Sequence, residues 1–138
     1  MNTALFANVN WLAVLAAAIA YFALGALWYS ALFGKRWVAY HNITIDPEAK
    51  KGVGAIMLSS FVLMAIAVCC LAMLVSRIGL TEAVSGLKLG LITGVGFAAT
   101  AVSIGYLYTK KPFGLHLIDG FYHILGNVIA AMILCVWH

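Results

Sequence analysis

The chain has 138 residues, of which 65% are hydrophobic and 9% are charged, and it carries a formal net charge of +4. A soluble domain is usually about half apolar and about a quarter charged, and a chain this short has too much surface to hide the excess of apolar side chains from water. The composition therefore excludes an ordinary soluble domain and predicts a protein surrounded by membrane lipid. Nucleic-acid binding is excluded as well, because no basic stripe carries aromatic side chains spaced for base stacking.

Four long stretches of the sequence are nearly free of Lys, Arg, Asp and Glu. A helix needs roughly 20 apolar residues to cross the hydrocarbon of a bilayer, and in lipid its backbone polar groups must be satisfied inside the helix. We therefore predict one transmembrane domain over residues 1–138, folded as an all-α integral membrane four-helix bundle. The predicted spans lie near residues 10–32, 53–75, 87–108 and 116–137.

The basic residues between the predicted spans are distributed unequally. The loops at one end of the bundle contain Lys35, Arg36, Lys50, Lys51, Lys110 and Lys111. The opposite end has only Arg77 and Lys88. Because basic loops stay in the cytoplasm, this asymmetry predicts that both termini lie on the non-cytoplasmic side. The basic loops are also expected to touch anionic lipid headgroups.

Aromatic and basic side chains mark the expected cytoplasmic boundary of the membrane. Tryptophan and tyrosine are enriched at membrane–water interfaces, and lysine side chains near helix ends extend toward the same interface. The predicted interfacial anchors are Trp28, Tyr29, Trp37, Tyr108, Lys110 and Lys111. The motif Asp46-Pro47-Glu48 is typical of a helix N-terminus, and it predicts that the second helix begins there before it enters the membrane.

Small residues recur at helical spacing, where they would let two helix backbones approach closely. Gly86, Gly90 and Gly94 are four residues apart in the third span. Further candidates for close packing are Gly25, Gly120 and Gly126. These positions predict helix contacts either inside the bundle or between subunits.

The fourth span contains a row of polar side chains. His116, Asp119, His123 and Asn127 are separated by three, four and four residues, so they share one face of a helix. Ionisable groups within a span are costly and usually face protein or water. Polar side chains at similar depth in the other spans are Tyr21, Ser59, Ser60 and Ser103. The sequence therefore predicts a polar layer in the cytoplasmic half of the bundle.

Three interpretations of this layer are open from the sequence. In the first, its groups hydrogen-bond one another and fix the helix register, and Asp119 pairs with Lys110 or Lys111. In the second, a cavity open to the cytoplasm binds a small polar molecule or relays protons through His123. In the third, His116, Asp119 and His123 hold a metal ion or haem. That pattern has low specificity and no HExxH or CxxC motif accompanies it, so no cofactor is predicted.

Several short motifs together resemble a known family. The first span and the residues that follow it contain Asn10-Trp11-Leu12-Ala13-Val14, Tyr21, Gly25, Trp28-Tyr29-Ser30, Phe33-Gly34-Lys35 and Trp37. This run resembles the opening of the bacterial family catalogued as domain of unknown function 1761, and the stretch from Ile118 to His123 resembles that family's last helix. The resemblance implies a small four-helix protein of the bacterial inner membrane with no established reaction. It transfers no catalytic residue.

The function expected from the sequence is non-catalytic. Four spans joined by short loops leave little protein outside the bilayer to hold a soluble substrate. We expect the chain to act by helix–helix association, as a homo-oligomer or as an accessory subunit of a larger membrane complex. The alternative is a carrier or membrane enzyme that binds a small molecule, a proton or a metal in the polar layer. The sequence leaves open whether the polar face of the fourth span looks into the bundle or toward a neighbour. Replacing His123 and Asp119 by apolar residues separates the two hypotheses, because loss of a cellular phenotype from an intact assembly would exclude a purely structural role.

Overall fold

The computed structural model describes residues 3–42 and 52–138, and over these residues the chain is helical with no β-strand. Four helices are long and apolar enough to cross a membrane, which confirms the predicted all-α architecture: Trp11–Leu32, Val53–Ile78, Ala83–Tyr108 and Phe113–Val136. In chain order the elements are η1 (Thr3–Leu5), α1 (Trp11–Leu27), η2 (Trp28–Leu32), α2 (Gly34–His41), α3 (Val53–Ile78), α4 (Ala83–Thr93), η4 (Gly94–Ala99), α5 (Thr100–Tyr108) and α6 (Phe113–Val136). Two of these, η2 and η4, are π-helical segments that interrupt the first and third long helices.

Local sequence signals explain several helix ends. Asn10 caps α1, because its Oδ1 accepts hydrogen bonds from the backbone N–H groups of Leu12 and Ala13 at 3.1 and 3.2 Å. Helix α3 ends at Gly79, whose φ of 75° is a left-handed conformation that glycine adopts readily. The helix start predicted at Asp46-Pro47-Glu48 lies outside the described residues.

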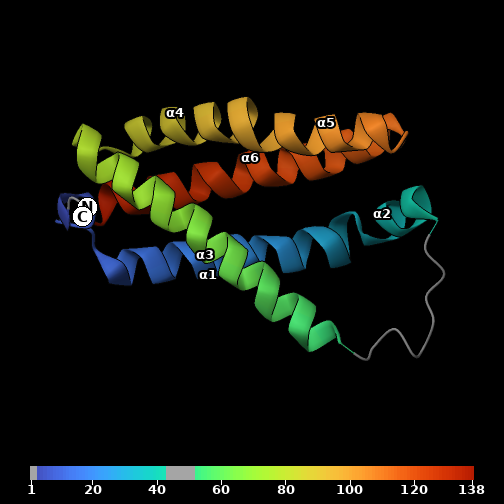
Figure 1. Cartoon of the computed structure of the whole chain (residues 1–138), viewed down its shortest axis with the longest axis horizontal. Coiled ribbons are helices and arrows are strands. Elements are labelled where there is room, and N and C mark those ends of the chain that lie inside the picture. The colour runs from blue at the N-terminus through green and yellow to red at the C-terminus, as the bar shows by residue number, and fades with distance from the viewer. Residues whose placement is uncertain (1–2, 43–51) are drawn as a thin grey trace.

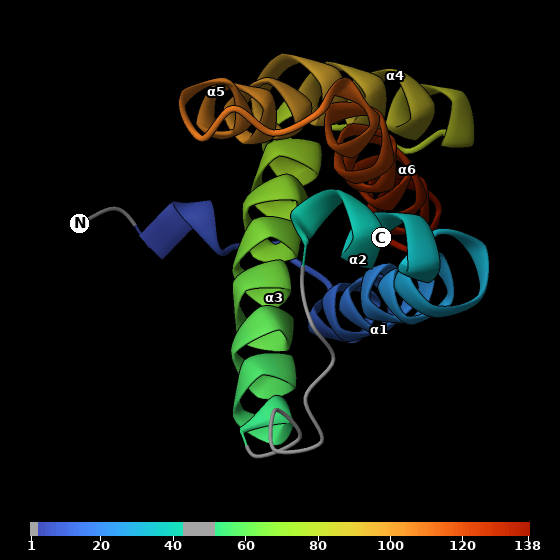
Figure 2. The same cartoon turned by 90° about the vertical axis from the view of Figure 1, so that its right-hand side faces the viewer.

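Helix α6 lies at the centre of the bundle. It packs against α1, α3, α4, η4 and α5, and it contains more buried residues than any other helix that the structure describes. In Figure 1, α1, α6 and the α4–η4–α5 rod run along the long axis, with the C-terminus at one end and α2 at the other. Helix α3 packs on α1 and α6 but crosses them obliquely, so its N-terminal half diverges from the bundle (Figures 1 and 2).

Three glycines bring the α4–η4 segment directly onto the backbone of α6. A Cβ atom at Gly86 would lie 2.7 Å from Cα of Met132, and one at Gly90 would lie 2.7 Å from the backbone nitrogen of Val128. Gly94 faces the α6 backbone in the same way. These distances are too short for any side chain, so the glycine stripe is occupied by contacts inside this chain.

A short helix that the sequence analysis missed, α2, follows the first long helix. Residues 34–41 were expected in a loop, but they form a helix that ends at Asn42, with a φ of 53°. The Trp37 ring packs edge-to-face on Tyr29 with their centroids 5.8 Å apart. The Tyr40 ring covers Gly114 so closely that a Cβ atom there would lie 2.7 Å from the tyrosine hydroxyl oxygen. Helix α2 therefore docks on the N-terminal end of α6.

The replacement Gly90→Ala is expected to lower the free energy of unfolding in detergent by about 1–3 kcal/mol, because the new methyl group would push α4 away from α6. The matched control is Gly96→Ala in the same rod, where an added Cβ atom meets nothing within 4 Å. That variant should be neutral, or stabilised by up to about 1 kcal/mol through its better helix propensity. Thermal unfolding followed by circular dichroism measures both changes, and equal melting temperatures for the two variants would contradict the packing described above.

Candidate functional site

The polar face of α6 is turned into the bundle. Asp119 and Asn127 are buried, and both are hydrogen-bonded to side chains of other helices. The two carboxylate oxygens of Asp119 accept one hydrogen bond each, from the hydroxyl groups of Tyr29 and Tyr106. The expected pairing of Asp119 with Lys110 or Lys111 is therefore wrong. A buried carboxylate needs donors at close range, and two tyrosines of η2 and α5 supply them inside the bundle.

A second polar cluster lies one to two turns further along α6. The Tyr21 hydroxyl oxygen lies 2.8 Å from Nδ1 of His123, and Nδ2 of Asn127 donates to the same hydroxyl oxygen at 3.4 Å. Nδ2 of Asn127 also donates to the backbone carbonyl of His123 at 2.7 Å, and its Oδ1 lies 3.2 Å from the Thr93 hydroxyl. This cluster, Tyr21, Thr93, His123 and Asn127, joins α1, α4 and α6.

Aromatic rings hold the two polar clusters in place. The Tyr122 ring is central to them, with its centroid 5.1 Å from the ring of Tyr29, 5.5 Å from that of Tyr21 and 4.8 Å from that of His123. The Tyr122 ring lies over Gly25, where a Cβ atom would come within 2.8 Å of its hydroxyl oxygen. The Tyr21 ring lies over Gly126 in the same manner. These two glycines therefore make room for tyrosine rings, whereas Gly120 makes only an ordinary contact.

Two of the predicted interfacial anchors have a different position from the one expected. Trp28 is buried, and its Nε1 donates to the backbone carbonyl of Ile118 at 3.0 Å. Tyr29 points inward to Asp119. Their place along the chain suggested the membrane boundary, but the π-helical turn of η2 directs both side chains toward α6. Tyr108 and Lys110 are exposed, as an interfacial role would require.

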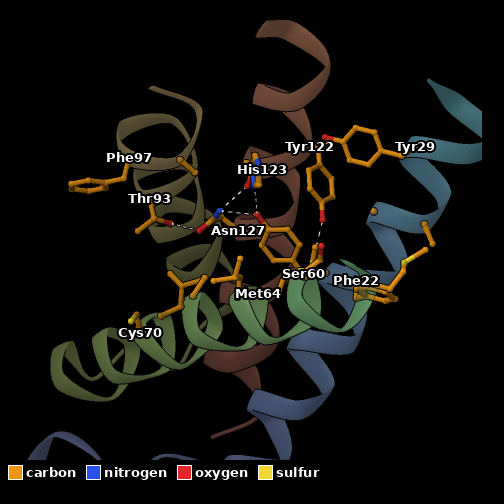
Figure 3. Close-up of a pocket in the computed structure, with 18 of the residues that line it drawn as sticks. Phe22, Tyr29, Ser60, Met64, Cys70, Thr93, Phe97, Tyr122, His123 and Asn127 are labelled. Atoms are coloured by element: carbon orange, nitrogen blue, oxygen red, sulfur yellow. Dashed lines mark hydrogen bonds between the residues drawn. The ribbon is translucent and has the colours of Figure 1, made fainter. Parts of the chain in front are cut away.

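A cavity of about 1080 Å³ lies beside the second cluster, between α1, α3, η4 and α6 (Figure 3). Its polar lining includes Tyr21, His123, Asn127 and Thr93 on one side and Ser60 of α3 on the other. The remaining wall is almost entirely apolar, including Phe22, Met57, Leu63, Met64, Leu71, Leu74 and Phe97. Both π-helical segments contribute to the wall, and such segments are frequent at functional sites.

Several side chains that line the cavity along α3 and η4 are exposed on the outside of the bundle. Leu63, Leu74 and Phe97 line it and are also exposed at its rim, with 67%, 43% and 71% of their surface accessible. No Asp, Glu, Lys or Arg is among the residues that line the cavity within the described chain. The second interpretation of the sequence expected a cavity open to the cytoplasm. Whether the cavity is open to the cytoplasm stays a prediction, and its exposed lining is mostly apolar, with Ser30 as an exposed polar member.

Several residues of the predicted polar layer do not join these clusters. Ser59 is exposed, and Ser103 is half-buried but does not line the cavity. The His116 ring packs against Tyr106 and Phe113, with centroids 5.6 and 6.1 Å away. Within residues 3–42 and 52–138, no three His, Cys, Asp or Glu side chains come together to hold a metal ion. The set His116, Asp119 and His123 is therefore not assembled as a ligand group.

Sequence analysis missed Tyr106, Tyr122 and His41. Tyr122 lies next to His123 on α6, but its spacing does not place it in the polar row. His41 ends α2, where its ring packs on Trp37 and Tyr106 with centroids 4.3 and 5.9 Å away. Its Nε2 is buried and has no hydrogen-bond partner within the described chain. Burial lowers the pKa of His41, and the charge of Lys111 adds to this effect, whereas Asp119 acts in the opposite direction.

Comparison with known proteins identifies the family but no activity. The family model described as "Protein of unknown function (DUF1761)" matches residues 12–135. No curated protein and no solved structure gives a significant match to the chain. The resemblance found in the sequence is thus confirmed over nearly the whole chain.

The replacement Tyr106→Phe should lower the free energy of unfolding by about 1–3 kcal/mol, because it removes one of the two hydroxyl groups that solvate the buried Asp119 carboxylate. Tyr108→Phe is the matched control, since that side chain is 86% exposed. Thermal unfolding in detergent compares the two variants. Equal stability of Tyr106→Phe and wild type would contradict the hydrogen bond to Asp119.

The docking of α2 should weaken as the pH falls. A free histidine has a pKa of about 6.5, and the docked His41 has a lower one, so the undocked state binds protons more readily below about pH 6.5. The stabilising effect of neutral His41 is therefore complete above that pH and is lost progressively below it. The ¹⁹F resonance of fluorotryptophan at Trp37, assigned by Trp37→Phe, should shift over this range. His41→Gln should abolish the shift and His138→Gln should not; a shift that persists in His41→Gln would refute this.

Proposed function

Since the chain belongs to the DUF1761 family of proteins of unknown function, we propose its activity from the geometry of the cavity alone. The protein crosses a lipid bilayer four times and binds a neutral, lipid-soluble small molecule in the lateral cavity between α3 and η4. The single observation that supports this proposal most is the cavity itself. It combines a volume of about 1080 Å³, largely apolar walls and one polar side.

Composition and charge support the proposed membrane insertion and sidedness. The exposed apolar surface of the four long helices needs a hydrocarbon solvent. Lys35, Arg36, Lys110 and Lys111 belong to the end of the bundle formed by α2 and the α5–α6 turn. Because basic loops remain in the cytoplasm, we assign this end to the cytoplasm and the opposite end to the other side. The inner membrane of a bacterium is the location that fits this orientation.

The chemistry of the cavity selects the kind of ligand. Small-molecule sites usually enclose about 300–1,000 Å³ and combine apolar walls with a few polar groups that fix orientation. This cavity has that character, and the absence of Lys, Arg, Asp and Glu from its described lining disfavours a phosphate, carboxylate or ammonium group. A ligand entering from the bilayer would keep its hydrocarbon part against Leu63 and Phe97 and turn its polar head toward His123.

Action by helix association, which the sequence favoured, has less support. Its strongest feature was the stripe of Gly86, Gly90 and Gly94, and these residues contact α6 of the same chain. The stripe is therefore not available to a second copy or to a partner subunit. Assembly through another lipid-facing surface stays a prediction, and it is compatible with ligand binding.

The proposed function can be tested by photolabelling with a long-chain alkyl benzophenone in nanodiscs. Benzophenone is neutral, lipid-soluble and inserts into nearby C–H bonds on irradiation. Mass spectrometry should locate the label on residues that line the cavity, such as Met57 and Met64. The replacement Ala67→Trp should remove most of this label, because the indole would fill the cavity from α3.

The matched control for Ala67→Trp is Ala55→Trp, which adds the same side chain to an exposed position of α3 outside the cavity. This variant should be labelled like the wild type. Labelling spread evenly over the lipid-facing helices, or equal labelling of the two tryptophan variants, would rule out the cavity as a binding site.

A further inference from the structure

We infer that the ligand of this cavity carries a carbonyl oxygen, which accepts a hydrogen bond from Nε2–H of His123. The inference rests on the proposed function and specifies the chemical class of the ligand head. The cluster of Tyr21, Thr93, His123 and Asn127 supplies the argument. The backbone carbonyl of His123 can only accept a hydrogen bond, and from this bond the direction of each further hydrogen bond in the cluster can be assigned in turn.

The backbone carbonyl of His123 fixes the orientation of the Asn127 amide. A carbonyl oxygen only accepts hydrogen bonds, so the amide atom 2.7 Å away must be the nitrogen. The second N–H of this amide is directed to the Tyr21 hydroxyl oxygen at 3.4 Å. The amide oxygen is left on the side of Thr93, whose hydroxyl lies 3.2 Å away. Figure 3 shows these contacts converging on Asn127.

The Tyr21 hydroxyl then fixes the tautomer of His123. Its oxygen already accepts from Asn127, and its single hydrogen is free to point to Nδ1 of His123 at 2.8 Å. If Nδ1 carried a hydrogen instead, the hydroxyl hydrogen of the buried Tyr21 would have no acceptor within the described residues, which is costly. We therefore assign Nδ1 as the acceptor, with its lone pair toward the tyrosine. A neutral imidazole with an unprotonated Nδ1 carries its hydrogen on Nε2. The tautomer is thus set by a chain of hydrogen bonds that starts at the backbone carbonyl of His123 in α6.

Nε2–H of His123 is a hydrogen-bond donor that makes no hydrogen bond within this cluster. It has no hydrogen-bond partner within the described residues, yet it is not among the buried unpaired atoms, and His123 lines the cavity. Ser60 lines the opposite wall, and its hydroxyl likewise makes no hydrogen bond within the described chain. A carbonyl oxygen accepts hydrogen bonds and can pair with such a donor. A head that only donates hydrogen bonds would leave Nε2–H unpaired in a dry site, which is costly.

The tautomer can be tested without any ligand. In protein labelled with ¹⁵N-histidine, the ring nitrogen shifts distinguish the two neutral tautomers and the imidazolium, and His123→Phe assigns the His123 signals. We expect an unprotonated Nδ1 and a protonated Nε2 at neutral pH. A protonated Nδ1 in the wild type would overturn the inference, whether or not the cavity binds ligands.

The ligand class can be tested with two probes of the same ring size and alkyl chain that compete with benzophenone photolabelling. A long-chain alkyl cyclopentanone offers a hydrogen-bond acceptor, and a pyrrole with the same chain on a ring carbon offers its N–H as a donor. The ketone should compete about 3- to 10-fold better than the pyrrole in the wild type, as expected for one satisfied hydrogen bond. His123→Phe should remove the preference. Tyr21→Phe, which retains the ring but releases Nδ1, should reduce the preference because the imidazole can then adopt either tautomer.

The two proposals fail in different ways. If benzophenone labels the cavity but ketone and pyrrole compete equally in the wild type, the carbonyl inference is wrong and the binding function stands. If no probe labels or competes at the cavity, both proposals are wrong. An undiminished preference for the ketone in a folded His123→Phe variant would show that His123 is not the donor.

Discussion

A polar side chain that is removed from water has to be hydrogen-bonded within the protein, and this constraint organises the bundle. Helix α6 carries three such side chains on one face, Asp119, His123 and Asn127, and residues of the surrounding helices bind them. Tyr29 and Tyr106 solvate the carboxylate, while Tyr21 binds the imidazole and the amide. These contacts set the rotation of each helix around α6, because a small rotation would leave a polar group unpaired in an apolar medium.

The same packing explains why a cavity exists beside these groups. The α4–η4 segment packs directly against α6, because Gly86, Gly90 and Gly94 contact the α6 backbone. In the N-terminal half of α3, as far as the structure describes it, a Cβ atom at Gly54 would meet nothing within 4 Å, and this half diverges from the bundle beside the hollow (Figures 1 and 3). The bundle is therefore tight on the side of α4 and open on the side of α3. A site that takes its ligand from the bilayer requires this asymmetry.

The sequence specified the helices well and the side-chain directions poorly. Uncharged stretches long enough to cross a bilayer have few alternatives to a helix, so four long helices could be predicted from composition. The spacing of His123 and Asn127 also placed them on one face. Depth estimates alone could not separate Ser60, which lines the cavity, from its neighbour Ser59, which is exposed. A depth estimate does not fix the rotation of a helix about its axis. The inward direction of Trp28 and the crossing angle of α3 depend on tertiary contacts, for which the sequence carries no periodic signal.

The most direct measurement of the central claim is electron paramagnetic resonance of a nitroxide at Ser60→Cys, in nanodiscs, with Cys69, Cys70 and Cys135 replaced by alanine or serine. A lateral cavity open to hydrocarbon predicts a mobile label that is relaxed by lipid-soluble oxygen and hardly affected by a water-soluble nickel chelate. Saturation with a long-chain alkyl ketone should then reduce the access of oxygen. An immobile label shielded from oxygen would mean that α3 closes onto η4 in a bilayer. A label relaxed mainly by nickel would mean that water fills this space, and either result would contradict a lipid-accessible binding cavity.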